Sequence, residues 1–284
     1  MVSYHPDPDC LNALLRSLDG QVSPILIVDN TEPSATLDPA LTDRPDVQII
    51  HPGRNIGVAA AINRGIGILI EAGCRHALLL DQDSQAEPGM VRSLVTELER
   101  LEAGGHRTAA IGPRIRDQDT GAIAPFIRFA LPFNKRLANG QGSVKCDFLI
   151  TSGCLVNLAH WAAIGPMRES WFIDNIDLEW CFRARRRGFE IRGCLDSALD
   201  HRIGEHRRLA GLIPFRHHAP SRLYTMMRNR MFLYRSNAPC AWIIQDSLRA
   251  VGKLALFSLI QPRWQNLTQM LRGLRDGWRT RPVP

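Results

Sequence analysis

The spacing of apolar residues changes along the first thirty positions of the chain. Leucines recur at three- and four-residue intervals between residues 11 and 18, directly after the Pro and Asp residues at positions 6–9. This spacing and this start signal predict a capped amphipathic helix. Residues 25–28 (ILIV) are instead a continuous apolar run, which is the pattern of a strand buried on both faces. A helix that ends near Gly20 is therefore expected to lead into a buried strand.

Strand and helix patterns continue to alternate as far as residue 101. Further strands are predicted at residues 47–51 and 77–80, and helices at residues 57–72 and 88–101. This alternation indicates an α/β fold with an open, largely parallel sheet flanked by helices. Ligands bind at the carboxyl ends of the strands in such sheets. The polar residues that follow these strands, and that we expect to converge, are Asp29, Asn55, Asp81 and Asp83.

The second half of the chain has a less regular pattern. Residues 112–145 are rich in Gly, Pro and polar groups and predict only a loop or hairpin region. Strand character returns at residues 148–157 and 189–199, and residues 175–187 predict a helix between them. Residues 221–278 are mainly helical. The C-terminal part is therefore expected to be a helical extension of the α/β fold.

Composition and charge support this division. The 284 residues are 45% hydrophobic and 22% charged, as in a globular protein with one core and an appendage. Residues 201–284 carry 15 Lys and Arg against 3 Asp and Glu, a net charge of +12 within a total of +7. We divide the chain into an α/β domain at residues 1–220 and a basic helical extension at residues 221–284. Such a basic segment suits the phosphates of nucleic acid or of anionic lipid headgroups, and an ordinary solvated surface is the alternative.

The sequence also bears on location. The first ten residues have neither a basic leader nor an apolar run, so a cytoplasmic protein is expected. Residues 242–260 are apolar but contain Asp246, which disfavours a transmembrane helix. They predict instead an interfacial helix that associates peripherally with the inner face of the cytoplasmic membrane. The apolar residues of that helix are Trp242, Ile243, Ile244, Leu248, Val251, Leu254 and Leu256, interspersed with Arg249 and Lys253.

The seven cysteines suggest no special chemistry. They are odd in number and include no C-x-x-C pair, so neither a zinc site nor a disulfide framework is expected. We interpret them as buried thiols.

Residues 78–84 (LLLDQDS) place two carboxylates at the end of a predicted strand. Asp81 and Asp83, two residues apart at a sheet edge, are suited to a hard divalent cation that neutralises a diphosphate. The D-x-D pattern is common by itself, and a loop pair that caps the following helix is the alternative. After the third strand of an α/β sheet, it resembles the metal-binding motif of glycosyltransferases with the GT-A fold.

Residues 54–65 (RNIGVAAAINRG) resemble the N-x-G-x-x-x-A-x-N-x-G signature of glycosyltransferase family 2, and residues 2–6 and 27–30 resemble its two nucleotide-edge segments. A helix N-terminus with a neighbouring Arg suits phosphate, and a carboxylate can accept a pyrimidine N3–H. The two Asn residues are either local fasteners or base contacts. The nucleotide-sugar-binding residues that the resemblance implies are Ser3, Tyr4, Asp29, Arg54, Asn55, Asn63 and Asp81.

Residues 171–183 (WFIDNIDLEWCFR) resemble the segment of the same family that ends D-x-[DE]-x-x-x-R. The resemblance implies that Asp177 is the catalytic base. Ile176 stands where many relatives have Glu, so Asp174, one helical turn from Asp177, is the alternative carboxylate. Glu179 and Arg183, four residues apart, are interpreted as a structural pair.

Two shorter segments complete the resemblance. Residues 150–153 (ITSG) are similar to the family's acceptor-side segment, and residues 200–204 (DHRIG) to its H-x-x-G. A His at a strand end is otherwise a hydrogen-bonded loop residue. The acceptor-side residues implied are Ser152, Gly153 and Trp171. The metal ligands implied, for Mg²⁺ or Mn²⁺, are Asp81, Asp83 and His201.

The resemblance spans residues 2–234 and is closest to bacterial rhamnosyltransferases, including those of O-antigen and rhamnolipid assembly. It implies a metal-dependent, inverting transfer from a nucleotide sugar to a glycan or lipid-linked acceptor, as in lipopolysaccharide biosynthesis. The implied donor is dTDP-L-rhamnose, and another donor such as a UDP-hexose is the alternative.

Two other functions fit the sequence less well. A sugar nucleotidyltransferase needs a Gly-rich loop beside its first strand, and residues 2–8 contain no glycine. A basic nucleic-acid-binding protein is the alternative from another class, but the aromatic residues of the extension are not interleaved as a stacking platform. No nucleic-acid partner is therefore expected.

Overall fold

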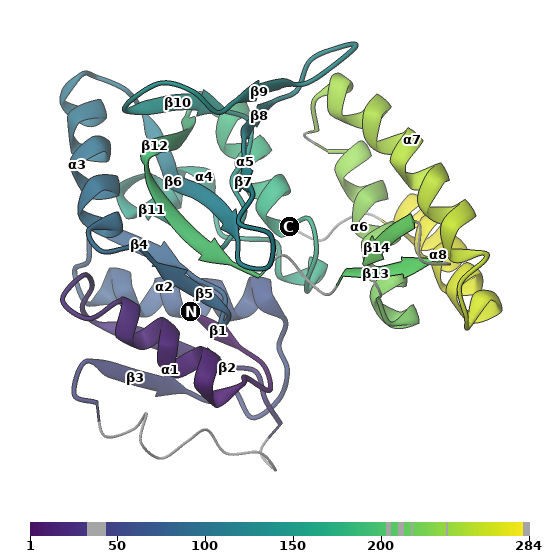
Figure 1. Ribbon diagram of the computed structural model, residues 1–284, viewed down its shortest axis with the longest axis horizontal. Coiled ribbons are helices and arrows are strands. Elements are labelled where there is room, and N and C mark those ends of the chain that lie inside the picture. The colour runs from purple at the N-terminus through teal and green to yellow at the C-terminus, as the bar shows by residue number, and fades with distance from the viewer. Residues whose placement is uncertain (33–43, 203–205, 210–212, 217, 237, 281–284) are drawn as a thin grey trace.

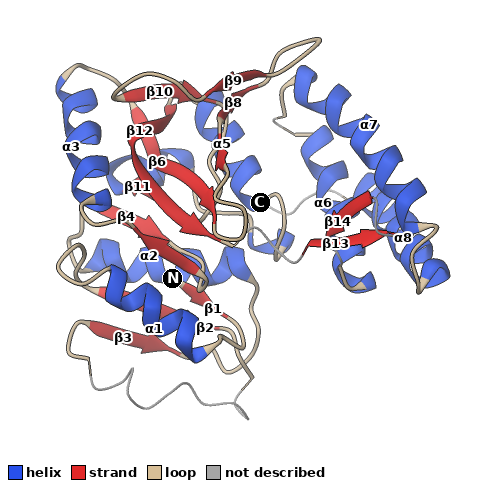
Figure 2. Cartoon of the chain, viewed as in Figure 1, coloured by secondary structure: helices blue, strands red, loops and turns tan. Residues whose placement is uncertain are grey.

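The computed structural model describes every residue except 33–43, 203–205, 210–212, 217, 237 and 281–284. Its larger part is a twisted sheet with helices on both faces, and its C-terminal helices lie together at one side (Figures 1 and 2). This arrangement confirms the predicted α/β fold with a helical C-terminal region.

The first strands pair in parallel, as their alternation with helices predicts. β1 (Val2–Ser3), β2 (Ile25–Asp29) and β3 (Val47–Ile50) form one parallel sheet in the order β1-β2-β3. A parallel bridge between Val2 and Asp81 links this sheet to the end of β4 (His76–Leu79). All five residues of β2 are buried. Its continuous apolar run is therefore explained by cover on both faces.

Three helices follow the first strands: α1 (Pro8–Ser17), α2 (Val58–Glu71) and α3 (Met90–Ala103). The Asp7 carboxylate caps α1 by accepting a hydrogen bond from the Cys10 amide at 2.9 Å, which satisfies one of the unpaired donors at the helix start. The apolar faces of α1 and α3 pack in one buried cluster, and that of α2 packs in another. α1 and α2 lie on opposite faces of the sheet (Figure 1).

The remaining strands of the core form a seven-stranded mixed sheet. Its path is β10-β12-β6-β11-β4, with β5 beside β12 and β7 beside β6. Only the β6–β12 pair in it is parallel, so the expectation of a mostly parallel sheet holds for the first half alone. The new strands are β5 (Ser84–Ala86), β6 (Thr108–Asp117), β7 (Ile123–Ala124), β10 (Ser143–Cys146), β11 (Cys154–Asn157) and β12 (Glu190–His201).

Connection length explains the antiparallel pairs. Residues 118–153, all of which the structure describes, contain no helix, whereas a parallel neighbour requires a crossover that is usually helical. Residues 112–145 therefore contain hairpins, including β8 (Phe126–Arg128) with β9 (Lys135–Leu137). β6 was not predicted, and the strand expected at residues 148–157 begins only at Cys154.

Several short elements and four long helices complete the chain. The elements before β12 are η2 (Leu158–His160), α4 (Trp161–Ile164), η3 (Glu169–Trp171) and α5 (Ile176–Arg186). Those after it are β13 (His206–Leu209), β14 (Ile213–Arg216), α6 (Pro220–Tyr234), α7 (Cys240–Phe257) and α8 (Arg263–Arg279). The predicted helices at residues 175–187 and in the C-terminal extension are therefore confirmed.

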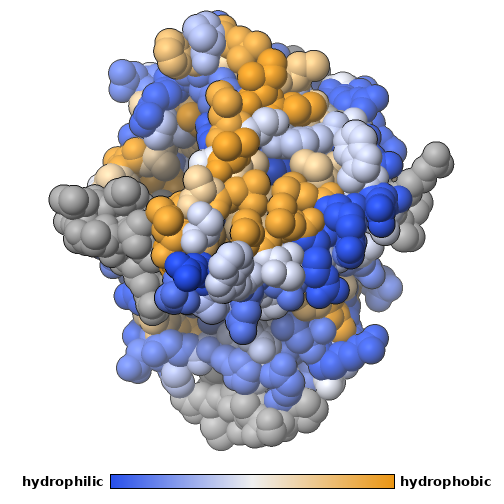
Figure 3. All heavy atoms as spheres, turned by 90° about the vertical axis from the view of Figure 1, so that its right-hand side faces the viewer, coloured by the Kyte–Doolittle hydropathy of each residue, from blue (hydrophilic) through white to orange (hydrophobic). Residues whose placement is uncertain are grey.

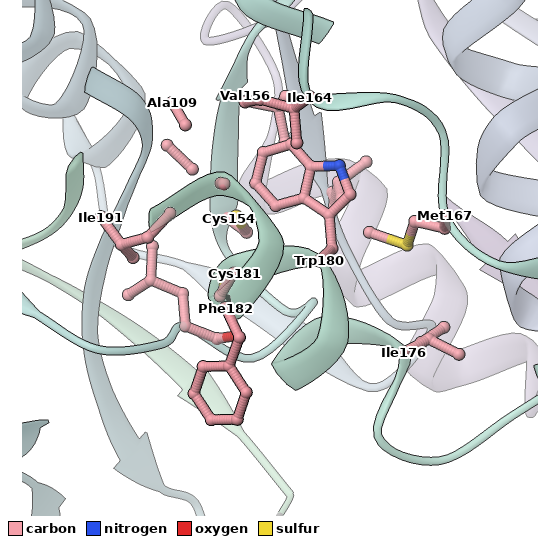
Figure 4. Packing of buried hydrophobic residues seen from close by; sticks show 14 of the residues in the cluster. Ala109, Cys154, Val156, Ile164, Met167, Ile176, Trp180, Cys181, Phe182 and Ile191 are labelled. Atoms are coloured by element: carbon pink, nitrogen blue, oxygen red, sulfur yellow. Dashed lines mark hydrogen bonds between the residues drawn. The ribbon is translucent and has the colours of Figure 1, made fainter. Parts of the chain in front are cut away.

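α5 lies in the largest apolar cluster. Its Trp180 is 1% exposed and packs beside Ile164 and Val156 (Figure 4). Trp242 of α7 belongs to the same cluster, with its ring centroid 5.8 Å from that of Phe182. The C-terminal helices are therefore anchored in the core of the α/β domain.

All seven cysteines are free, in agreement with the absence of a predicted disulfide framework. Four of them are buried, but Cys240 at the start of α7 is exposed. The interpretation as buried thiols thus holds for only part of the set.

Candidate active site

Asp81, Asp177 and His201, three of the predicted catalytic and metal residues, line a cavity of about 430 Å³ at one edge of the sheet, whereas Asp83 and Asp174 do not line it. Asp81 follows β4, Ser152 precedes β11, Asp177 lies in the first turn of α5 and His201 ends β12. A second cavity, of about 360 Å³, lies between β2 and β4, and none of these four residues lines it. The first cavity is therefore the candidate active site.

Asp81 is fixed by the acceptor-side segment. Its Oδ2 accepts a hydrogen bond from the Ser152 hydroxyl at 2.5 Å, and Ser152 is 1% exposed. Gly153 has φ +84°, and a Cβ there would lie 2.8 Å from the Pro113 ring. Only glycine therefore lets the Ser-Gly turn pass Pro113 and present the hydroxyl to Asp81.

Two of the predicted metal ligands, Asp81 and Asp83, lie on either side of the third, the His201 imidazole. His201 Nδ1 lies 3.2 Å from Asp83 Oδ1, and its Nε2 lies 3.9 Å from Asp81 Oδ2. The Ser84 hydroxyl is also 3.2 Å from Nδ1. Within the described part of the chain, no group of three or more His, Cys, Asp or Glu side chains has the spacing of a metal site. The His201 imidazole thus lies between the two carboxylates. A shared cation would instead require all three side chains to face one point.

The donor atoms nevertheless fit a divalent cation in kind. Carboxylate oxygens with one imidazole nitrogen suit Mg²⁺ or Mn²⁺. The Asp81 and Asp83 side chains are 42% and 36% exposed, so both can be reached by a metal with its bound diphosphate. Coordination requires the His201 ring to leave its present position between them.

The two candidate bases have different surroundings. Asp174 is bound by Arg222, whose Nη2 and Nε lie 3.1 and 3.4 Å from its two carboxylate oxygens. Asp177 lines the cavity with Asp81. Burial, with repulsion from Asp81 and Asp174, raises the pKa of Asp177 to about 6, against the opposing backbone hydrogen bond from Leu178. A carboxylate with a pKa near the working pH is an effective general base.

The Glu179–Arg183 pair is structural, as predicted. Glu179 is 1% exposed and accepts hydrogen bonds from Arg183 Nε at 2.9 Å and Nη2 at 2.8 Å. Arg183 also donates to the carbonyls of Ile164, Gly165 and Pro166. The pair therefore joins α5 to the loop after α4 and takes no direct part in the cavity.

Asp29 is a buried carboxylate at the end of β2. It is 1% exposed, and its Oδ1 accepts hydrogen bonds from the hydroxyls of Ser3 at 2.9 Å and Thr31 at 2.7 Å. Its Oδ2 is buried without a hydrogen-bond partner among the described residues, with His51 Nδ1 at 3.5 Å. One carboxylate oxygen therefore keeps a hydrogen-bonding capacity that the described residues do not fill. Ser3 orients Asp29, and Thr31, which the sequence motifs did not identify, does the same.

Tyr4 lies at the edge of the same region. Its amide donates to Gln82 Oε1 at 2.8 Å, and its hydroxyl to Glu32 Oε1 at 3.3 Å. The side chain is 45% exposed. Gln82 therefore links the end of β1 to the loop that carries Asp81 and Asp83, a function that the spacing of the two carboxylates did not reveal.

The start of α2, which was predicted to face phosphate, is in contact with the loop before α5. Its first amides, those of Val58 and Ala59, both donate to the Phe172 carbonyl, at 2.7 and 3.3 Å. Gly57 has φ +83°, and a Cβ there would lie 2.5 Å from the Phe172 ring. The glycine of the N-x-G motif thus permits a contact between α2 and the loop before α5, and that contact occupies the helix N-terminus.

Asn55 and Asn63 of this motif make local hydrogen bonds. The Asn63 side chain donates to the Met167 carbonyl at 2.8 Å and accepts from the Met167 amide at 2.9 Å. Asn55 Oδ1 accepts from the Gly57 amide at 2.9 Å. Arg54, Asn55 and Asn63 line a separate shallow depression, so the structure does not bring them to the Asp81 cavity.

Trp171 is also placed differently from the prediction. It is 1% exposed, its ring centroid lies 5.6 Å from that of Phe232, and it does not line the Asp81 cavity. The wall of the cavity is instead formed mainly by the segment predicted only as loop or hairpin, with Phe148 and two residues from the C-terminal side. The wall residues that motif spacing did not identify are Pro125, Phe126, Ile127, Phe148, His218 and Arg222.

Comparisons with known proteins agree with this arrangement. The family model described as Glycosyl transferase family 2 matches residues 8–156. The chain is 31% identical over 242 residues to a dTDP-rhamnosyl transferase, RfbF, of Shigella flexneri, covering 84% of this chain and 79% of that protein. It is 31% identical over 138 residues to an N-acetylglucosaminyl-diphospho-decaprenol L-rhamnosyltransferase of Mycobacterium tuberculosis, covering 45% of this chain and 43% of that protein.

Solved structures show the same fold at low sequence identity. S. aureus TarS (residues 1–349, with UDP-GlcNAc) superposes with a TM-score of 0.63 at 13% identity and covers 97% of this chain and 79% of that one. GalNAc-T7, solved with UDP, GalNAc and Mn²⁺, gives a TM-score of 0.56 at 14% identity over 80% of this chain and 46% of that one. These structures support the GT-A fold.

Proposed function

Because this chain belongs to glycosyl transferase family 2 and is a glycosyltransferase, we propose that it transfers L-rhamnose from dTDP-L-rhamnose, with inversion, to a glycan or lipid-linked acceptor. The two relatives named above as rhamnosyltransferases support the sugar, and the name of the Shigella protein supports dTDP. The mycobacterial name supports a lipid-linked acceptor. The observation that carries the proposal is the single cavity that contains both Asp81 and Asp177.

In this proposal, the Asp177 carboxylate removes the proton of an acceptor hydroxyl. The freed oxygen attacks the anomeric carbon as the bond to the nucleotide diphosphate breaks, so that the configuration inverts in one displacement. Asp81, Asp83 and His201 are the residues that would hold a divalent cation, and such a cation neutralises the charge of the departing diphosphate. The Ser152 hydroxyl fixes the Asp81 carboxylate in place throughout.

The nucleotide is proposed to lie between this cavity and Asp29. The unpaired Oδ2 of Asp29 can accept the N3–H of thymine or of uracil, so this contact supports a pyrimidine nucleotide and does not separate dTDP from UDP. The choice of dTDP rests on the relatives. A thermal-shift panel with dTDP-, UDP- and GDP-sugars and Mg²⁺ or Mn²⁺ tests it, because bound ligand raises the unfolding temperature. Stabilisation by a UDP-sugar with none by dTDP-L-rhamnose would exclude the proposed donor.

The exposed face of α7 supports a membrane partner. Ile244, Leu248 and Val251 are 50%, 73% and 65% exposed, and their four- and three-residue spacing places them on one side of the helix. Figure 3 shows an apolar band over this side of the molecule. Trp242, expected on the same face, is 4% exposed and packs in the core. Among the helices that the structure describes, none has the length and apolarity to cross a bilayer.

We propose that this face rests on the anionic inner leaflet and brings the cavity to a lipid-linked acceptor. Arg249 is exposed and directly follows Leu248. Each basic residue adds about 1 kcal/mol to the binding free energy near an anionic surface. Flotation with phosphatidylserine vesicles tests the proposal: Val251→Asp should lose binding, and Ile70→Asp, an exposed residue of α2, should keep it. Equal flotation of both variants, or none by the wild type, would contradict it.

A further inference from the structure

We infer that Asn229 and Arg228 of α6 are positioning residues that hold the loop preceding the helix turn of the candidate base, Asp177. The inference rests on the proposed function, because it assigns these two residues to the action of Asp177. It also gives α6, which was predicted as part of a separate helical extension, a function in the active site.

The loop between η3 and α5 has an unusual backbone. Phe172, Asp174 and Asn175 have φ values of 66°, 65° and 63°, in the left-handed region that residues with a Cβ seldom adopt. Such conformations persist only where neighbouring groups fix them. Asn175 is the N-cap residue of α5 and makes no capping hydrogen bond with its side chain. Within the segment, the Phe172 and Ile173 amides donate to the carbonyls of Glu169 and Trp171, and the remaining contacts come from other parts of the chain.

Asn229 provides the largest share of these contacts. It is 0% exposed, and its Nδ2 donates to the carbonyls of Trp171 at 2.9 Å, Ile173 at 2.7 Å and Asp174 at 3.0 Å. One buried amide thus binds the backbone on both sides of the residue at φ 66°. This contact fixes the course of the loop rather than any side chain in it.

Arg228 orients that amide and binds the same loop. Its Nε and Nη2 donate to Asn229 Oδ1 at 3.1 and 3.0 Å, so the amide oxygen is occupied and the Nδ2 group faces the carbonyls. Arg228 Nη2 also donates to the carbonyls of Ser170 and Trp171, each at 3.1 Å. From the same helix, Arg222 binds the Asp174 carboxylate.

The loop sets the position of Asp177 through the first turn of α5. The Glu179 amide donates to the Asn175 carbonyl at 3.0 Å, so the turn that contains Asp177 starts from the held loop. The Asp29 site lies on β2 and the Asp81 loop follows β4, and α6 makes none of the hydrogen bonds described for them. Removing the contacts of Arg228 and Asn229 with the loop should therefore displace the base and leave nucleotide binding intact.

The test compares Arg228 of α6 with Arg235, the residue that directly follows α6, because both side chains donate hydrogen bonds to backbone carbonyls. Arg228→Lys removes the fork that binds Asn229 and the loop. Arg235→Lys is the matched control, because Arg235 donates to the carbonyls of Gly277 and Thr280 in and after α8 and lies over the Trp278 ring. Asn229→Ala and Asn266→Ala, the latter at a buried Asn of α8 that binds the Ile260 carbonyl, form a second pair.

Two readouts are measured on the full chain. With dTDP-L-rhamnose and Mg²⁺, Arg228→Lys and Asn229→Ala should lower kcat for nucleotide release by about 10–100-fold, the order expected when a catalytic group is misplaced. The Kd for dTDP should stay within about twofold, as for binding that does not involve the displaced group. Amide hydrogen exchange in residues 169–178 should quicken in both variants and stay unchanged in both controls.

The inference fails if Arg228→Lys leaves kcat and exchange at the wild-type values, or if Arg235→Lys lowers kcat equally. A Kd for dTDP that weakens in parallel with kcat would also overturn it, because α6 would then act on the whole fold. If the wild type releases no nucleotide from any sugar nucleotide, the proposed function fails, and hydrogen exchange alone still decides whether α6 holds the loop.

Discussion

Asp177→Asn should make the enzyme slower and the folded protein more stable. The amide keeps the shape of the carboxylate but cannot take the acceptor proton, so kcat should fall by about 10²–10⁴-fold, the usual contribution of a general base. The Kd for the donor should hardly change, since the base acts on the acceptor. In the wild type, kcat should rise with pH until Asp177 is ionised. A cation that neutralises Asp81 removes one cause of the raised pKa of Asp177 and should move this rise below pH 6.

The stability change follows from the same pKa. Folding raises the pKa of Asp177 from 3.8 to about 6, so between these values the folded state binds more protons than the unfolded state. Stability is therefore lost as the pH rises through this window. At pH 8 the ionised carboxylate costs about 3 kcal/mol, from 1.36 kcal/mol for each pKa unit, and at pH 5 about half as much. The Asn variant should recover this free energy.

Urea unfolding of metal-free wild type and Asp177→Asn at pH 5 and pH 8 measures this difference, and nucleotide release measures kcat on the same preparations. A variant that is more stable at pH 8, with a smaller gain at pH 5, agrees with the reasoning. A variant with wild-type kcat, or one that loses stability at pH 8, would refute the assignment of a buried, ionised base.

Three further changes give separate tests. Asp83→Ala should abolish metal-dependent nucleotide binding, and EDTA should stop turnover of the wild type; calorimetry with dTDP and Mn²⁺ checks both, and full activity in EDTA would contradict them. Asp174→Asn should lower kcat less than Asp177→Asn does, because Arg222 already binds that carboxylate; the reverse order would move the base to Asp174. Glu179→Ala should cost about 3–5 kcal/mol of unfolding free energy by removing the carboxylate that neutralises the buried Arg183, as measured by urea denaturation, and an unchanged midpoint would show that the ion pair does not stabilise the fold.

Local patterns predicted the elements that position the site. The apolar run of β2 and the leucine spacing of α1 were sufficient because each element buries the face that its period defines. Strand ends then brought Asp81, Ser152 and His201 together, since the carboxyl ends of β4 and β12 lie at the same edge as the amino end of the antiparallel β11. A sequence read in this way locates one side of the candidate active site.

Contacts between distant segments could not be predicted in the same way. The Phe172 carbonyl occupies the start of α2, and Asn229 binds a loop that precedes it by more than fifty residues. These are bonds from one side chain or carbonyl to distant backbone, and they leave no period in the sequence. The position of Trp171 could not be predicted for the same reason. An aromatic residue in a loop can bind a ligand or pack in the core, and only its neighbours in the fold decide between the two.

Turnover of nucleotide sugars by the full chain is the most direct test of the proposed rhamnosyltransferase activity. Nucleotide release from dTDP-L-rhamnose, UDP-glucose and GDP-mannose should be compared with Mg²⁺, with Mn²⁺ and with EDTA, for the wild type and for Asp177→Asn. We predict release from dTDP-L-rhamnose that requires the cation and is lost in the variant. Turnover of a UDP- or GDP-sugar in preference to dTDP-L-rhamnose, or equal release by the variant, would contradict a rhamnosyltransferase in which Asp177 is the base.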